Sequence, residues 1–476
     1  MRKIFPLTLL SLLFILGASS AQPTQAITVT ASANVIERYG FYELTVEHDD
    51  TPYANPWEDV HLSVRFTDPQ GQTTLVNGFY YGTNSWKVRF SPSQAGAWRW
   101  SLQMSTPAGS LSETGAFTVE PSQRPGFVRR HPTNPFRLVF EDGSLFNAIG
   151  IGDCIRDTDH SGTPLDNWGL DGEFRAHGEH VGGATLVDMP TYMTAYGASG
   201  AGFNLFRWSV DNCAFKLWET ISTQGNRYLI QEGLWGDQLV ETLRENGFRI
   251  WMTIFGFKPA FPDTAANNPE KQAAVERYID YIVARYGAYV DIWELMNEAK
   301  VPAEWIVFTA GHLRAVDPYD HLITTSWPRP NMPQIEINAP HWYERESEFE
   351  SDLRTSQMIL FAKQCNERTA QRGSDANRCD KPILFGEQGN SVQNWDERSA
   401  LRMRLRSWTA FFEEGVFVFW NSSFAKDYFA SAANLYIGPQ ERGYIRALQN
   451  FTADVDADVQ RFTFTLTSHD IRAYGL

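Results

Sequence analysis

Between residues 127 and 452, eight short apolar runs alternate with longer helical segments. The runs cover residues 145–152, 203–208, 248–255, 290–297, 321–327, 337–343, 382–387 and 416–420. The helical segments between them include residues 269–287, 349–372 and 396–415. Strands that alternate with helices are typical of a parallel sheet covered by helices. Eight such repeats predict an α/β fold of the (β/α)8 type, a TIM barrel, over residues 127–452.

A doubly wound open sheet is the alternative architecture for this alternation. That fold would carry a glycine-rich phosphate-binding loop after an early strand, and the sequence contains none. We therefore prefer the barrel. The active site of a TIM barrel lies at the C-terminal ends of its strands, so polar residues that end an apolar run are the first candidates for function.

Residues 27–120 have a different pattern, in which short alternating runs are separated by turn-forming segments such as DPQGQ and SPSQAG. About seven strands at this spacing predict an antiparallel β-sandwich. Residues 55–100 also resemble an N-terminal module often attached to bacterial polysaccharide-degrading barrels, which implies an accessory role. Residues 121–126, PSQRPG, are expected to be a linker. Residues 453–476 are expected to add one or two strands that cap the barrel or begin a further β-domain.

The first 26 residues predict a signal peptide. Arg2 and Lys3 precede a short apolar run, LTLLSLLFIL, and small residues follow it. The run is too short to span a bilayer, and no later stretch is long and apolar enough to replace it. We expect a soluble mature protein, secreted or periplasmic, with no membrane partner once the signal is removed.

The formal net charge of −15 at pH 7 argues against nucleic acid as a partner, because a polyphosphate would be repelled. Neutral polymers stay compatible with this charge. Aromatic residues make up 14% of the chain and include 16 tryptophans, which suits stacking on sugar rings, although any one aromatic is more often part of a core. The sequence indicates no cofactor and does not indicate an oligomeric state.

Two of the apolar runs end in a glutamate. Glu298 follows Asn297, which ends the fourth run, and Glu387 ends the seventh. Two-step hydrolysis of a glycosidic bond needs two carboxyl groups about 5–5.5 Å apart. One attacks as a carboxylate, and the other must hold a proton near neutral pH, which requires a raised pKa. The ends of the fourth and seventh strands of a barrel could meet across one substrate.

A longer motif surrounds each glutamate. Residues 293–298 have the form W-E-x-x-N-E, and Glu387 lies in a G-E-x-G segment. In these motifs the chain resembles glycoside hydrolase clan A, most closely its family 5-like members. The resemblance implies a retaining β-glycoside hydrolase in which Glu298 is the general acid/base and Glu387 is the nucleophile. The plain alternative is that both are solvated acids at strand ends.

Asn297, Arg207 and Glu294 are expected to support the two glutamates. Asn297 would hydrogen-bond the 2-hydroxyl of the sugar, a contact that strengthens in the transition state. Arg207, near the end of the second run, resembles the clan's arginine that keeps the nucleophile ionised, and its alternative is an ordinary salt bridge to Glu294. Glu294 is four residues before Glu298, so both side chains are expected to point into the barrel, with Glu294 deeper. We therefore interpret Glu294 as part of a buried structural ion pair rather than as a catalytic residue.

His341, Tyr343 and Trp420 are further candidates for substrate binding. The first two lie in the sixth run, and Trp420 ends the eighth. The resemblance implies that His341 and Tyr343 contact the nucleophile and the sugar, although packing explains either of them almost as well. Trp420 matches the clan's sugar platform, because a flat apolar ring complements the C–H face of a pyranose.

Three histidines in the long segment after the first run suggest a metal site: His160, His177 and His180. The sequence HGEH separates the last two by three residues, but its flanks do not predict a helix and no third ligand is indicated. We expect solvated or substrate-contacting loop residues and no metal.

The four cysteines are too few for a disulfide scaffold. In an oxidising compartment the pairing to test first is Cys365–Cys379 with Cys154–Cys213. Buried free thiols are the equally weighted alternative.

The sequence therefore predicts a secreted retaining β-glycoside hydrolase that cleaves β-linked poly- or oligosaccharides through a covalent glycosyl-enzyme. A non-catalytic carbohydrate-binding protein is one alternative, and the presence of both glutamates argues against it. A transglycosylase that uses the same two glutamates is another. The sequence does not indicate the glycan, its linkage, or endo as against exo action.

Overall fold

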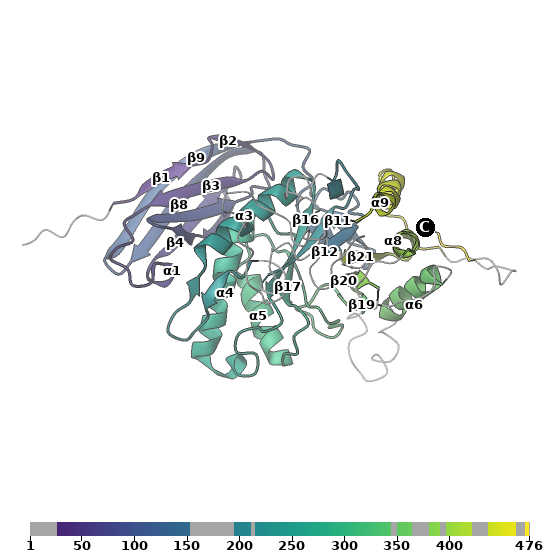
Figure 1. Ribbon diagram of the computed structural model, residues 1–476. Helices are drawn as coiled ribbons and strands as arrows, with labels where there is room; N and C mark the ends of the chain where they lie inside the picture. The colour runs from purple at the N-terminus through teal and green to yellow at the C-terminus, as the bar shows by residue number, and fades with distance from the viewer. Residues whose placement is uncertain are drawn as a thin grey trace, which may run out of the picture.

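The computed structural model describes residues 26–152, 195–210, 215–343, 350–363, 380–390, 397–420, 437–462 and 472–475. They form a β-sandwich and an eight-stranded parallel barrel with helices around it (Figure 1). The predicted fold class, a TIM barrel preceded by a β-sandwich, is confirmed. Within the described ranges, none of the helices combines the length and the apolarity that crossing a membrane requires.

The sandwich consists of a four-stranded and a five-stranded sheet. The first has the order β1-β3-β7-β6, with β1 (Thr28–Ala31), β3 (Tyr42–Glu47), β6 (Phe79–Gly82) and β7 (Ser85–Phe90). The second has the order β2-β9-β8-β4-β5, with β2 (Val35–Glu37), β4 (His61–Thr67), β5 (Thr73–Asn77), β8 (Gly96–Thr106) and β9 (Gly109–Glu120). A short helix, α1 (Pro56–Asp59), precedes β4.

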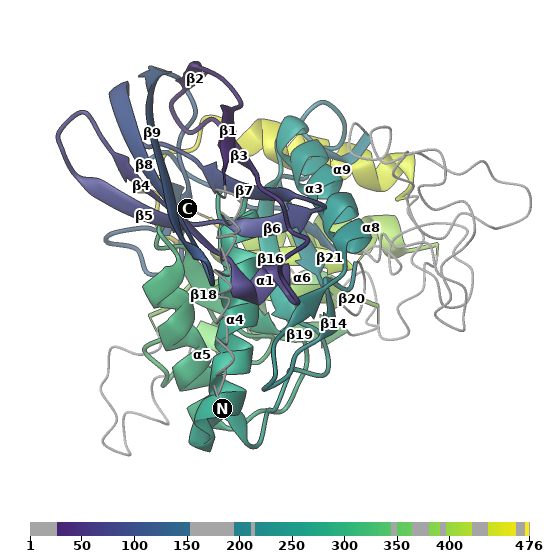
Figure 2. The same ribbon diagram turned by 90° about the vertical axis from the view of Figure 1, so that its left-hand side faces the viewer.

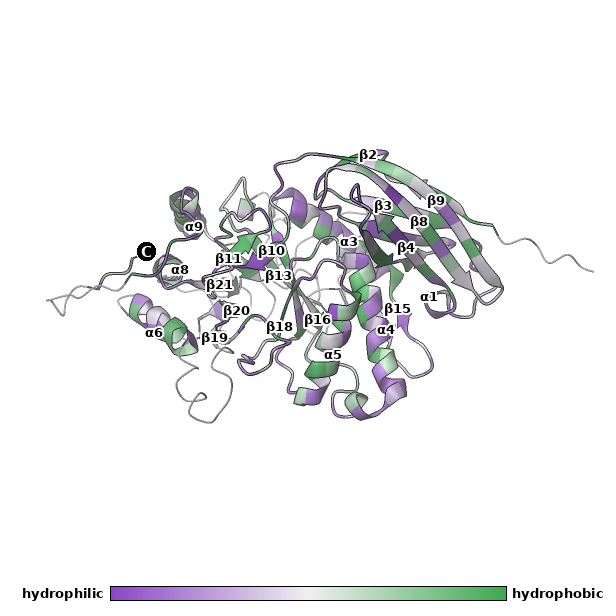
Figure 3. Ribbon diagram, turned by 180° about the vertical axis from the view of Figure 1, so that it is seen from behind, coloured by the Kyte–Doolittle hydropathy of each residue, from purple (hydrophilic) through white to green (hydrophobic). Residues whose placement is uncertain are grey.

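Alternation of side chains explains why these segments are strands. Along β8, Trp98, Trp100, Leu102 and Met104 are buried and the residues between them are exposed. The colour of the sandwich strands changes repeatedly along their length, as apolar and polar residues follow one another (Figure 3). This period of two turns one face of each sheet toward a shared core. The described strand pairs are antiparallel except β2 with β9, which is parallel. The antiparallel prediction is corrected at this edge, because the chain passes from edge strand β1 to edge strand β2 of the other sheet without a hairpin.

The barrel is one sheet of parallel strands in the order β18-β17-β16-β13-β12-β21-β20-β19. Its strands are β12 (Gly150–Gly152), β13 (Leu205–Ser209), β16 (Arg249–Phe255), β17 (Ile292–Met296), β18 (Leu322–Thr324), β19 (His341–Tyr343), β20 (Ile383–Gly389) and β21 (Gly415–Trp420). The segment before β19 closes the ring, because the Glu336 amide donates to the Ile323 carbonyl at 2.8 Å and the Asn338 amide to the Pro382 carbonyl at 3.0 Å. Each strand overlaps one of the eight predicted runs.

Helices surround the barrel. They are α3 (Ile230–Glu245), α4 (Pro269–Tyr286), α5 (Ala303–Val316), α6 (Ser351–Lys363), α8 (Ser399–Phe412) and α9 (Pro439–Thr452), with a 3-10 turn η1 (Ala265–Asn267). The start of α4 is typical: the Asn268 side chain accepts a hydrogen bond from the Lys271 amide at 3.0 Å, and Pro269 occupies the first turn. The sandwich lies against the side formed by α3 and α4, and α6, α8 and α9 lie on the opposite side (Figures 1 and 2).

Two hairpins belong to the barrel region and were not predicted from the sequence. The first pairs β10 (Val128–Arg130) with β11 (Leu138–Phe140), and the second pairs β14 (Trp218–Thr220) with β15 (Arg227–Tyr228). Val128 and Leu138 pack into the apolar core inside the barrel. The Val128 amide also donates to Asp291, the residue before β17, at 3.2 Å. The first hairpin therefore covers the N-terminal end of the barrel, away from the strand ends that carry function.

Alternate residues of the strands fill the barrel interior in layers. The lower layer is apolar and contains Leu205, Trp251, Ile292, Leu322, Ala339, Leu384 and Val418. Two residues further along five of these strands, the inward positions hold Arg207, Thr253, Glu294, Thr324 and His341. Because side chains alternate along a strand, this polar layer lies directly above the apolar one. The polar layer forms the floor of the candidate site.

A buried ion network joins the sandwich to the barrel. Arg89 in β7 donates to both oxygens of Asp237 in α3, at 3.0 and 2.7 Å, and Arg285 in α4 donates to the same oxygens, both at 2.9 Å. Glu43 accepts from Nε of Arg89 at 2.9 Å. Burial raises the pKa of Asp237, but the two arginines outweigh burial and hold that pKa below its ordinary value. We call these four residues the interface network.

Candidate active site

The floor of the site is built around Arg207, which is fully buried in β13. Its Nε and Nη2 donate to the two oxygens of Glu294 in β17, at 2.7 and 2.8 Å. Those oxygens also accept from the hydroxyls of Thr253, at 2.9 Å, and Ser326, at 2.6 Å. Burial raises the pKa of Glu294, but the ion pair with Arg207 outweighs burial and leaves that pKa below its ordinary value. Glu294 is thus a fixed counter-ion in a buried pair.

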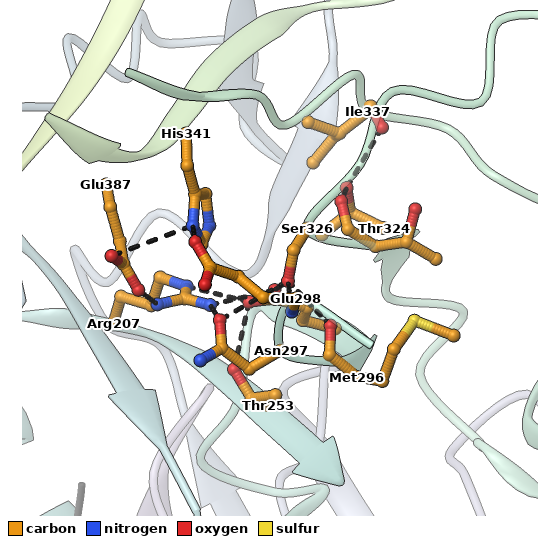
Figure 4. A network of polar contacts seen from close by, with 12 residues as sticks. Arg207, Thr253, Met296, Asn297, Glu298, Thr324, Ser326, Ile337, His341 and Glu387 are labelled. Atoms are coloured by element: carbon orange, nitrogen blue, oxygen red, sulfur yellow. Dashed lines mark hydrogen bonds and ion pairs between the residues drawn. The ribbon is translucent and has the colours of Figure 1, made fainter. Parts of the chain in front are cut away.

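Arg207 also reaches the two predicted residues beside it. Its Nη1 donates to Oε1 of Glu387 at 3.0 Å, and its Nη2 donates to Oδ1 of Asn297 at 2.8 Å (Figure 4). The hydroxyl of Tyr343 donates to the other oxygen of Glu387. Burial and the charge of Glu387 raise the pKa of Tyr343, so its phenol keeps the proton. Arg207 is therefore a partner of Glu387 and of Glu294 at once, and we call these three residues the mouth network.

A β-bulge in β20 turns Glu387 into the barrel. Leu384 points inward, so strict alternation would turn residue 387 outward. The pairing with β21 shifts its register around Glu387, which lies opposite the inward-pointing His341 of β19. A bulge adds one residue and reverses the parity of those that follow. Gly386 permits this bulge, since a Cβ there would lie 3.0 Å from Nε2 of His341.

Glu298 lies two residues beyond β17, in left-handed backbone with a φ of 48°. A residue other than glycine rarely adopts this conformation and keeps it only where the surroundings hold it. The Glu298 amide donates to Oγ of Ser326 at 2.8 Å, and the preceding amide, of Asn297, donates to the Phe255 carbonyl at 3.0 Å. The turn leaves the Glu298 side chain 33% exposed, whereas that of Glu387 is 9% exposed. Glu298 is the more accessible of the two carboxyl groups.

His341 lies between the two glutamates. Its Nδ1 is 2.7 Å from Oε1 of Glu298 and 3.6 Å from Oε2 of Glu387 (Figure 4). Because Nδ1 faces two carboxylates, it carries the ring proton and donates it to Glu298. This hydrogen bond lowers the pKa of Glu298 and outweighs burial, which raises it. The shift is opposite to the raised pKa expected from the sequence, because the imidazole stabilises the carboxylate more than partial burial destabilises it.

The three groups are close enough to share one ligand. One oxygen of Glu298, one oxygen of Glu387 and a ring nitrogen of His341 all lie within 4.8 Å of one another, the one such group in the part of the chain that the structure describes. A divalent cation could bind there, and it would neutralise both carboxylates. The histidines considered for a metal, His160, His177 and His180, and all four cysteines lie outside the described residues.

Trp420 ends β21 and is 7% exposed. Its ring lies against Gly152 of β12, where a Cβ would be 2.9 Å from Cε3 of the indole. The close approach needs a glycine at position 152. Among the described residues, little of the Trp420 ring is left accessible to a ligand. A role for Trp420 as a sugar platform stays a prediction.

Thr253 and Ser326 were not predicted, although both bind Glu294. Ser326 also accepts the Glu298 amide, so it links the buried pair to the strained turn. A signal was present for Thr253, which is a hydroxyl residue at an inward position of a mostly apolar run, and Ser326 shares the inward parity of Leu322 and Thr324 in its own run. A polar group inside a barrel needs a polar partner, and this requirement points to a buried charge nearby.

A family model described as a domain of unknown function, DUF5060, matches residues 35–105, which lie in the sandwich. No curated protein matches the chain. A solved structure of a proposed glycoside hydrolase from Bacteroides vulgatus is similar at 18% identity and a TM-score of 0.59, over 88% of this chain and 79% of that one. At this identity the similarity establishes a shared fold.

Two further solved structures are similar over less of the chain. An exo-β-1,4-mannosidase from Opitutaceae bacterium strain TAV5 has 14% identity and a TM-score of 0.45, over 68% of this chain and 62% of that one. A broad-specificity endoglucanase from Clostridium longisporum has 11% identity and a TM-score of 0.41, over 64% and 96%.

Proposed function

We propose that the chain is a retaining β-glycoside hydrolase that acts on β-linked poly- or oligosaccharides, with Glu387 as nucleophile and Glu298 as general acid/base. The observation that carries the proposal is that an oxygen of each glutamate lies within 4.8 Å of the other. Retaining enzymes hold their two carboxyl groups about 5–5.5 Å apart, whereas inverting enzymes need about 6.5–9.5 Å to admit a water molecule. The short separation favours the retaining route.

In the first step a carboxylate oxygen of Glu387 attacks the anomeric carbon and forms a glycosyl ester. The bond from that carbon to the leaving oxygen breaks, and Glu298 gives its proton to that oxygen. Arg207 and Tyr343 each donate to one oxygen of Glu387. These two donors bind the carboxylate from two sides and fix its plane.

In the second step Glu298, now a carboxylate, takes a proton from water. The water oxygen attacks the anomeric carbon, the ester bond breaks, and Glu387 becomes a carboxylate again. Two inversions return the sugar in its original configuration. Asn297 accepts from Arg207 through Oδ1, which orients its amide nitrogen to donate to a sugar hydroxyl.

The lowered pKa of Glu298 makes this chemistry most effective in acid. The first step needs Glu298 protonated, and the hydrogen bond from His341 favours the ionised form. Activity should therefore fall as the pH rises through the lowered pKa of Glu298, because the proton donor is lost. We expect an acidic pH optimum.

Labelling with 2-deoxy-2-fluoro-β-glycosyl fluorides tests the proposal. The fluoride leaves without protonation and the fluorine at C2 slows release of the sugar, so the glycosyl ester accumulates. Mass spectrometry of a digest should find the added mass on Glu387, and the Glu387→Gln variant should take no label. Azide should also rescue Glu387→Gly and give an α-glycosyl azide. Folded wild-type protein that takes no label from the gluco, manno, galacto or xylo reagents would contradict the proposal.

Two alternatives predict different outcomes of this experiment. A non-catalytic carbohydrate-binding protein would take no label. A transglycosylase would be labelled on the same residue. At high acceptor concentration its products would be sugars joined to the acceptor rather than free sugars.

We also propose that residues 1–26 direct export. This predicts a mature N-terminus after Ala21 or Ala26, which N-terminal sequencing of the exported protein would measure.

A further inference from the structure

Trp327 is the one exposed tryptophan among the residues that the structure describes, with 36% of its surface accessible. It lies three residues beyond β18, at the C-terminal ends of the barrel strands. A single exposed aromatic on a protein surface is ordinary by itself. The position of this one is not ordinary, because it stands at the rim of the candidate site.

The ring of Trp327 lies beside the acid/base end of the site. Its centroid is 6.0 Å from that of the His341 imidazole, with 43° between the two planes. The same imidazole is 2.7 Å from Glu298 through Nδ1. In the order of the strands, Trp327 follows β18, which pairs with β17, the strand that precedes Glu298, whereas Glu387 lies on β20. Trp327 is therefore on the side of the site from which Glu298 protonates the leaving oxygen.

The backbone that carries Trp327 is held in place. Oγ1 of Thr325 donates to the Trp327 carbonyl at 2.7 Å. Nζ of Lys381 donates to the carbonyls of Arg329, at 3.0 Å, and Met332, at 2.8 Å. Pro328 and Pro330 fix their own φ angles, which restricts the segment further. A ring held in this way can bind a ligand without first being ordered.

We propose that Trp327 is the platform for the sugar unit of the leaving group, so that the substrate is an oligo- or polysaccharide in which another pyranose departs with the proton of Glu298. The inference rests on the proposed function and makes it more specific. A flat apolar ring stacks on the C–H face of a pyranose, whereas a small alcohol offers no such face. The predicted platform at Trp420, on β21 beside Glu387, would instead serve the sugar that is attacked.

Reactivation of the labelled enzyme tests this inference separately from the first step. Wild type and Trp327→Ala are labelled with the 2-fluoro reagent that marks Glu387, and excess reagent is removed. The rate at which activity returns is then measured in buffer alone and with the β-1,4-linked disaccharide of the same sugar. The disaccharide must occupy the leaving-group side to accept the glycosyl unit, so it reports on that side alone.

We expect the disaccharide to accelerate reactivation of wild type, and Trp327→Ala to lose at least about tenfold of that acceleration. Reactivation by water should be the same in both. Trp327→Leu, which is apolar but has no flat face, should behave like the alanine variant, and Trp327→Phe should keep most of the effect. Phe361→Ala is the matched control, because Phe361 is 70% exposed but lies near the far end of α6.

The outcomes separate the two proposals. Labelling shows that a variant is folded before any acceptor is added, so a loss of acceleration is not a loss of structure. If wild type is labelled but no disaccharide accelerates its reactivation, or if the alanine and leucine variants respond like wild type, the platform assignment is wrong and the proposed function stands. If wild type takes no label, the proposed function is wrong.

Discussion

The interface network and the mouth network are both buried groups in which arginine binds carboxylates, and they differ in their balance of charge. The interface network has two arginines and two carboxylates, and Lys87 also contacts Glu43, so every carboxylate in it is matched by a cation. The mouth network has one arginine and two glutamates, so it carries an excess negative charge. A third carboxyl group, of Glu298, lies beside the second network and is accessible.

The balance of charge decides what each network can do. In a balanced buried network every charge has its partner, and the loss of one member leaves another uncompensated. In an unbalanced network one carboxylate is not fully neutralised. It can therefore stabilise the positive charge that develops at an oxocarbenium-like carbon. Both networks are buried, so burial does not distinguish them. The balance of charge distinguishes the network that holds two domains together from the network that belongs to the candidate active site.

Glu387→Ala should give the largest effect in either network. Without the nucleophile no glycosyl ester forms, and kcat for an aryl β-glycoside should fall on the order of 10⁴-fold or more. The variant leaves the mouth with one arginine and one glutamate, so the thermal unfolding midpoint should not fall. Kinetics and calorimetry on one preparation check both parts. Near-wild-type turnover in this variant would remove Glu387 from its role.

Asp237→Ala should give the reverse profile. Without Asp237, Glu43 is the one carboxylate of the interface network that remains beside the two buried arginines. The free energy of unfolding should therefore fall by about 3–5 kcal/mol. Turnover per folded molecule should stay close to that of wild type. Urea denaturation and active-site titration measure the two quantities.

Glu43→Ala is the matched control for that variant. Glu43 binds the same Arg89, but its side chain is 25% exposed, so water can replace it. We expect a loss of about 1 kcal/mol or less. Equal losses in the two variants would show that burial of the carboxylate does not decide its contribution to the free energy of unfolding.

His341→Ala should shift the pH dependence of activity. Nδ1 of His341 stabilises the Glu298 carboxylate and lowers its pKa. Removal of this donor lets the pKa rise, so Glu298 stays protonated to higher pH. The basic limb of kcat/KM against pH, measured with a substrate that has a poor leaving group, should therefore shift to higher pH.

His312→Ala is the control for that shift. His312 in α5 also pairs with a carboxylate, Asp280, at 2.7 Å, but it lies on the outside of the barrel. Its removal should not shift the basic limb of kcat/KM against pH. A basic limb that is unchanged or moves to lower pH in His341→Ala would show that His341 does not set the pKa of Glu298.

Zinc should give the smallest of the expected effects. An excess of Zn²⁺ should lower activity reversibly by bridging Glu298, His341 and Glu387, whose nearest ligand atoms lie within 4.8 Å of one another. A chelator should restore activity, and His341→Ala should be less sensitive than wild type. Equal sensitivity in the two proteins would exclude this site as the place of binding.

Much of the barrel and the placing of its glutamates could be predicted from the sequence, because both depend on local patterns. Glu298 and Glu387 follow apolar runs and lie in recognisable motifs, and the structure brings their carboxyl groups together. Their catalytic roles remain predictions. The pKa of Glu298 was predicted in the wrong direction, because it depends on where one nitrogen of His341 points, and no pattern in the sequence records that.

The interface network left no comparable signal. Asp237 and Arg285 are 48 residues apart on two helices, and Arg89 is 148 residues from Asp237. Charged residues are ordinarily exposed, so each of these three looks like a solvated side chain until the sandwich is packed against the barrel. Trp327 escaped prediction for a similar reason, since neither its exposure nor its neighbour His341 can be read from its own run.

The shared carboxylate of Asp237 bears on how such a chain can evolve. Recombination that exchanged the sandwich for an unrelated module would remove Arg89 and disturb the partnership between α3 and α4. An incoming module would have to bring an arginine at the equivalent register of its own strand, or the helices would have to mutate with it. Selection should therefore transmit the two halves together, as a single heritable unit rather than as interchangeable parts.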